Sequence, residues 1–128
     1  MKPRARLALL ALLACAAAAR AVDVPAAVDE AVEVADVRIA DRAVEATLRN
    51  RSAHALRNVR LMVDLVYHWP NETHPGDVSP GTAFVHVVAG PIAPGASELV
   101  RAVPPGGYPD APGTFEPRVK VLGFVEAP

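Results

Sequence analysis

Two histidines and a carboxylate lie close together in a segment that could offer ligands to a metal ion. They are His68, Glu72 and His74, and imidazole with carboxylate is a donor set that zinc accepts. Their spacing matches no helical or finger motif, and Pro70 and Pro75 stiffen the segment. We therefore expect exposed loop histidines and no metal site. A small periplasmic metal-binding protein or enzyme that uses the His68–His74 loop remains the alternative function.

Nucleophilic and phosphate chemistry have no recognisable pattern in the chain. The serines lack a Gly-x-Ser-x-Gly context, and the acidic residues are scattered without neighbours that would raise a pKa. The glycine pair at 106–107 has no following helix that would bind a phosphate group. We expect a protein that is not an enzyme and that uses no cofactor.

Tyr67 and Trp69 form the best candidate binding surface in the sequence. They lie at the predicted end of a strand, next to a long loop, and aromatic rings in such a place can stack on a peptide or a glycan. An envelope protein or a glycan is therefore the expected partner class. The structural alternative is that Tyr67 continues a buried face and Trp69 caps the edge of the core.

The N-terminus has the pattern of an export signal. Lys2, Arg4 and Arg6 precede an uncharged apolar run of 13 residues, 7–19. As a helix this run would be about 20 Å long, well short of the roughly 30 Å hydrocarbon core of a membrane. A basic leader, a short apolar centre and small residues at its end are typical of a cleaved signal peptide.

Two processing sites remain open. The small-x-small pattern at 19–21 predicts a signal peptide over 1–21 and a mature chain that begins at Val22. The run 12–15 resembles a bacterial lipobox, which would end the signal at residue 14 and make Cys15 the lipidated residue. Both alternatives predict an exported protein, periplasmic or extracellular. The second adds membrane attachment through the N-terminal lipid alone.

The charge balance of the exported part argues against anionic partners. The full chain has a net charge of −1. Removing 1–21 takes away four of the 13 basic residues and none of the 14 acidic ones, which leaves a net charge of 9 − 14 = −5. A mildly acidic domain disfavours nucleic acid. The single cysteine excludes an intramolecular disulfide, and the oligomeric state stays open.

Alternation with a period of two dominates the chain after an acidic leader, 22–33, which we expect to be flexible. The alternation predicts a domain over 34–126. Its expected strands are 34–39, 44–49, 59–68, 83–88, 97–103 and 115–125. We expect tight turns at Asp41-Arg42 and at Pro94-Gly95.

Two of these strands have well-defined faces. In the longest, one face carries Val59, Leu61, Val63, Leu65 and Tyr67, and the other carries Arg60, Met62, Asp64, Val66 and His68. In the last, Val119, Val121, Gly123 and Val125 alternate with Arg118, Lys120, Leu122 and Phe124. Pro117 indicates an edge position or a late start for that strand. Short strands separated by frequent turns predict an all-β, antiparallel sandwich of about six or seven strands after the signal segment.

Three segments, 44–52, 56–61 and 93–97, resemble the FxLYD-type bacterial β-sandwich domains. They contain a strand that ends in Asn and Ser, a short bridge, a long Val-alternating strand and a later Pro-Gly turn. Residues 65–69 occupy the place of the family's name-giving motif, without its Asp. The resemblance covers 34–126 and implies an immunoglobulin-like fold in an exported protein, with no catalytic residues. We therefore expect an exported cell-envelope accessory or binding module without catalytic activity.

Overall fold

The computed structural model describes residues 20–22, 25–71 and 73–127. Its elements are β1 (Arg20–Val22), α1 (Pro25–Ala31), β2 (Val32–Ala40), β3 (Ala43–Asn50), β4 (Leu56–His68), β5 (Thr82–Val88), β6 (Ser97–Ala102) and β7 (Thr114–Glu126). The predicted signal segment up to residue 19 lies outside the described residues.

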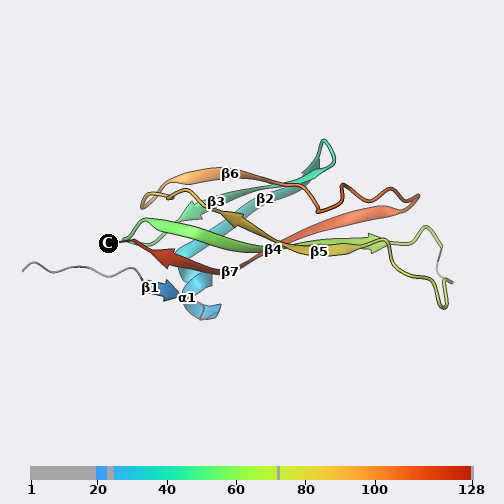
Figure 1. Ribbon diagram of the computed structural model, residues 1–128, viewed down its shortest axis with the longest axis horizontal. Helices are drawn as coiled ribbons and strands as arrows, with labels where there is room; N and C mark the ends of the chain where they lie inside the picture. Colours follow the sequence, from blue (N-terminus) through green and yellow to red (C-terminus); the bar gives the residue numbers. More distant parts are fainter. Residues whose placement is uncertain (1–19, 23–24, 72, 128) are drawn as a thin grey trace, which may run out of the picture.

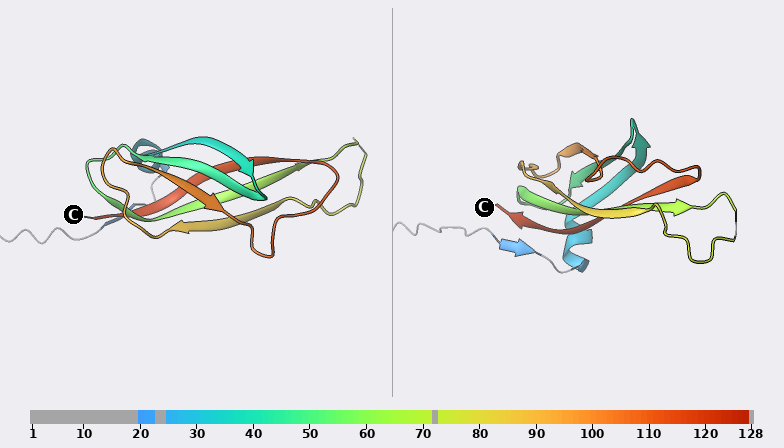
Figure 2. Two further views of the ribbon diagram at one scale, coloured as in Figure 1. Left: turned by 90° about the horizontal axis from the view of Figure 1, so that it is seen from above. Right: turned by 45° about the vertical axis from the view of Figure 1, so that its right-hand side comes forward.

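Two antiparallel sheets pack face to face, one with the strand order β1-β7-β4-β5 and the other with the order β2-β3-β6 (Figures 1 and 2). The predicted all-β, antiparallel, immunoglobulin-like sandwich is confirmed. Its core is one cluster drawn from both sheets. From β4 it includes Leu61, Val63 and Leu65, each no more than 1% exposed. The predicted buried face of this strand is also confirmed.

Tight turns shape the β2-β3-β6 sheet. Asp41 and Arg42 join β2 to β3, and their φ angles of 47° and 59° are those of a two-residue hairpin turn whose twist matches the flanking strands. In the turn before β6, Gly95 has a φ of 75°, a conformation that glycine adopts without steric penalty. Both turns were expected from the sequence.

Two β-bulges, each with an Asx residue in the left-handed region, change the phase of the apolar pattern. In β2, Asp36 and Val37 lie opposite one residue of β3, and Asp36 has a φ of 53°. In β4, Asn58 and Val59 lie opposite one residue of β7, and Asn58 has a φ of 49°. Because a bulge adds one residue to the strand, two apolar residues that are out of step with strict alternation can both face the core. In β4 these residues are Leu56 and Val59, so the strand begins at Leu56, three residues earlier than expected.

A third bulge in β7 changes the expected faces of that strand. Arg60 pairs with Gly123 while Leu61 pairs with Val121, so Leu122 is the extra residue. Strict alternation places Phe124 on the face opposite Val121, but in the structure both are buried, with 2% and 6% exposure. The extra residue at 122 rotates the end of the strand, and an aromatic ring takes the buried position.

Pro117 lies within β7, opposite Leu65. On the other side of β7, β1 reaches only residues 124–126 in the described part of the chain. The edge position expected for Pro117 therefore holds, and the late strand start does not, because β7 already begins at Thr114.

The leader expected to be flexible over 22–33 is structured from Pro25 onward. Pro25–Ala31 forms α1, and β2 begins at Val32. Val28, Ala31 and Val32 are buried, with 1%, 8% and 4% exposure. Val28 and Ala31 lie three residues apart on one side of α1, and together with Val32 at the start of β2 they anchor the short helix to the core. No helix among the described residues is long and apolar enough to cross a membrane.

Truncation of the buried face of β4 tests this packing. Leu61→Ala should lower the free energy of unfolding by about 2–5 kcal/mol, because it leaves a cavity between the sheets. Met62→Ala, on the outer face beside it, should cost roughly 1 kcal/mol or less. Equilibrium unfolding in urea measures both values. Equal, large losses at the two positions would mean that β4 is covered on both faces.

Candidate functional site

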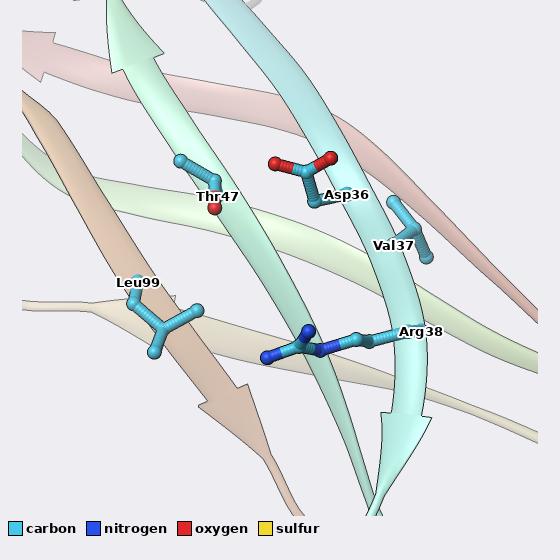
Figure 3. Close-up of a pocket in the computed structure, with 5 residues that line it drawn as sticks. All are labelled: Asp36, Val37, Arg38, Thr47 and Leu99. Atoms are coloured by element: carbon cyan, nitrogen blue, oxygen red, sulfur yellow. The ribbon is translucent and has the colours of Figure 1, made fainter.

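The outer face of the β2-β3-β6 sheet carries a shallow pocket at the β2 bulge. Five residues line it, and we call them the bulge pocket: Asp36, Val37, Arg38, Thr47 and Leu99. The space they enclose is about 270 Å³. Figure 3 shows the Arg38 side chain crossing β3 towards β6, with the Asp36 carboxylate and Leu99 around it. Three neighbouring strands therefore contribute to one depression.

An ion-pair network fixes the basic end of the bulge pocket. Arg38 Nη2 lies 3.1 Å from Glu45 Oε2, and Arg101 Nη1 lies 3.4 Å from Glu45 Oε1. Arg101 also donates to the carbonyl oxygens of Ala40 and Asp41. The Glu45 carboxylate thus pairs with two guanidinium groups at once. This arrangement holds the Arg38 side chain across the face of β3.

Asp36 and Leu99 are the parts of the bulge pocket that are open to a ligand. The Asp36 side chain is exposed, and its carboxylate has no ion pair or hydrogen bond among the described residues. Leu99 is 63% exposed although it lies in the middle of β6. Val37 packs against the core from the same bulge. The pocket therefore combines a free carboxylate with an apolar surface, which suits a ligand that is cationic and apolar.

Tyr67 and Trp69 lie at the far end of β4, away from the bulge pocket. Tyr67 is 8% exposed, and its hydroxyl oxygen accepts a hydrogen bond of 2.8 Å from the Gly113 N–H. A Cβ at Gly113 would overlap the Tyr67 ring, so the site requires glycine. Trp69 is half-buried, edge-on to Tyr67 at 4.9 Å and stacked on His74 at 4.1 Å between ring centroids. The Tyr67 ring is thus part of the packed interior. Of the two aromatic residues, only Trp69 is exposed enough to contact a ligand.

His68, the last residue of β4, and His74, in the loop after it, have different carboxylate partners. His68 Nε2 lies 3.0 Å from Glu116 Oε2, and His74 Nδ1 lies 3.2 Å from Asp77 Oδ2. The hydrogen bonds from His68 and then from Arg118 lower the pKa of the Glu116 carboxyl below its ordinary value. His74 Nε2 is buried without a partner among the described residues.

Two further residues singled out in the sequence are the candidate metal ligand Glu72 and the candidate lipidation site Cys15. Glu72 and Cys15 both lie outside the described residues. Within the described ranges, no group of three or more His, Cys, Asp and Glu side chains could hold a metal ion. The metal-binding alternative and the lipidation of Cys15 therefore stay predictions.

Sequence analysis missed the bulge pocket, although two signals were present. The apolar phase moves from Val34 to Val37 across an Asp, the residue type that tolerates a left-handed bulge. Leu99 occupies an outward position of β6, between Ser97 and Arg101. The break in alternation lies in β2 and the outward Leu99 lies two strands away in β6. Only the pairing of both strands with β3 brings these residues into one pocket.

Comparisons of the chain with protein-family models, with curated proteins and with solved structures found no match.

Proposed function

We propose that the protein is an exported accessory or binding module of the cell envelope, without catalytic activity, and that the bulge pocket is its binding surface. The observation that carries this proposal is that the free Asp36 carboxylate and the exposed Leu99 line one pocket, with Thr47 of β3 between them. Asp36 keeps a left-handed φ that is uncommon outside glycine. Bulges recur next to active sites, where they redirect a side chain.

The partner is an envelope protein with a basic side chain next to an aliphatic one. The basic group would pair with Asp36, and the aliphatic side chain would cover Leu99. The acidic balance of the exported part, with a net charge of −5 after removal of 1–21, also favours a cationic segment. Arg38 stays with Glu45 and forms the wall of the pocket.

Export can proceed through either processing site, and the pairing of β1 favours the site at Cys15. Arg20, Ala21 and Val22 pair with Glu126, Val125 and Phe124 of β7. Cleavage after Ala21 would leave only Val22 of this strand. Processing before Cys15 would keep all three residues in the sheet. We therefore include lipid attachment at Cys15 in the proposal, because it preserves the outer strand of the larger sheet.

Membrane fractionation tests the anchor. The wild-type chain, expressed in a bacterial host, should fractionate with membranes, and Cys15→Ser should move to the soluble part of the envelope. The reason is that two or three acyl chains hold a protein stably on a bilayer, whereas the domain alone does not. Mass spectrometry of the mature N-terminus completes the test. Soluble wild type that begins at Val22 would remove the lipoprotein proposal.

Peptide selection tests the binding surface. Random peptides displayed on phage and selected on the purified protein should become enriched in a Lys or Arg next to an aliphatic residue. Asp36→Lys should weaken the selected peptide by tenfold or more, about 1.4 kcal/mol, because it reverses the charge in the pocket.

Asp110→Lys is the matched control, since Asp110 is exposed on the loop before β7 and the change in net charge is the same. This variant should bind the peptide as the wild type does. Enrichment of acidic peptides, or equal losses in the two variants, would contradict the bulge pocket as the binding surface.

A further inference from the structure

The free edge of β5 differs from the other edges of the sandwich. β5 pairs with β4 in unbroken register from Thr82 to Val88, and β4 is its only strand partner in the described part of the chain. Its sequence is Thr-Ala-Phe-Val-His-Val-Val, with no Lys, Arg, Asp, Glu, Pro or Gly. An uncharged edge strand rich in β-branched residues is a template for pairing with another strand.

Each of the other edges carries a device that opposes pairing. β2 has the bulge at Asp36, which twists an edge away. β6 is six residues long and has exposed charges at Glu98 and Arg101. β7 is covered at residues 124–126 by β1 and contains Pro117, which lacks a backbone donor. Only β5 lacks such protection among the described strands.

We infer that β5 pairs antiparallel with β5 of a second copy, around a two-fold axis that passes by Val85. This register opposes all seven residues, Thr82 to Val88 and Val88 to Thr82, and makes the two four-stranded sheets continuous. A two-fold axis perpendicular to the sheet keeps the core faces of both copies on the same side. The inference is independent of export and of the bulge pocket.

The outer faces of the two copies are complementary in this register. Val85 meets Val85 of the second copy, and Val87 meets Ala83. Val85 and Val87 are 51% and 49% exposed in one copy, so the pairing covers apolar surface. Met62, the neighbour of Val85 on β4, extends the apolar stripe on both sides.

Opposite charges flank this stripe. On β4, Asp64 is the neighbour of Ala83, and Arg60 is the neighbour of Val87. Because Ala83 meets Val87 of the second copy, the row that carries Asp64 in one copy carries Arg60 in the other. Both such rows place opposite signs on the two sides of the axis, three strand spacings or about 14 Å apart, so no like charges oppose each other in this register.

The oligomeric state of the full mature chain tests the inference. Sedimentation velocity over a wide range of concentrations should show a monomer–dimer equilibrium for the wild type. Val85→Lys should give a monomer at every concentration, because it places two like charges directly opposite each other at the axis. A wild type that stays monomeric throughout would overturn the inference.

Leu99→Lys is the matched control, because Leu99 is equally apolar and 63% exposed but lies on the outer face of the other sheet. This variant should dimerise as the wild type does while it disturbs the bulge pocket. Loss of the dimer in Leu99→Lys, with Val85→Lys unaffected, would place the contact on the other sheet and refute the β5 pairing.

Cross-linking tests the register. With a short thiol-reactive cross-linker, Val85→Cys should form a covalent dimer. Val87→Cys alone should not, because residues 87 of the two copies lie four residues out of line. The wild type, whose only cysteine is Cys15, is the blank. Equal cross-linking at 85 and 87 would contradict the predicted register.

Discussion

The side chain of Asn50 links two of the connections that cross between the two sheets. Asn50 is fully buried, and its Nδ2 donates to the carbonyl oxygens of His54, at 2.7 Å, and Ile92, at 2.8 Å. Its Oδ1 accepts hydrogen bonds from the backbone N–H and the hydroxyl of Ser52. The amide therefore satisfies both of its donors and accepts twice, which is the full capacity of the group. The burial of a polar side chain is tolerable here because all of its hydrogen bonds are made.

Asn50 lies where two connections between the sheets meet, so its hydrogen bonds join segments that are far apart in the sequence. Asn50 ends β3, the chain then crosses to β4, and Ile92 belongs to the connection from β5 to β6. Ile92 also forms a two-way backbone bridge with Leu56, at the start of β4. The backbone of Asn50 bonds to Ala96 and Gly95, just before β6. One residue thus holds together two of the connections that pass between the layers, and it also bonds to the backbone just before β6, the strand that pairs with β3 at the bulge pocket.

Much of the fold was predictable because a strand with one buried face alternates apolar and polar residues, and this alternation is visible in the sequence as a period of two. The buried face of β4 and the turn at Asp41-Arg42 follow from that alternation alone. The bulges at Asp36, Asn58 and Leu122 were not predictable from alternation, since a bulge is a single break in the period that it interrupts. The family resemblance marked Asn50 only as the end of a strand, and its hydrogen bonds were not predictable from the sequence. The bulge pocket joins residues from three strands, and their alignment exists only in the folded sheet.

The most direct test of this account is the equilibrium unfolding of Asn50→Ala. The change removes the amide donor from the carbonyl oxygens of His54 and Ile92, and it leaves the backbone N–H of Ser52 without its acceptor. The free energy of unfolding should therefore fall by about 3 kcal/mol or more. Asn71→Ala is the matched control, since Asn71 is exposed in the loop after β4, and it should stay within about 0.5 kcal/mol of the wild type. A loss at Asn50 as small as that at Asn71 would contradict the claim that this residue holds the two layers together.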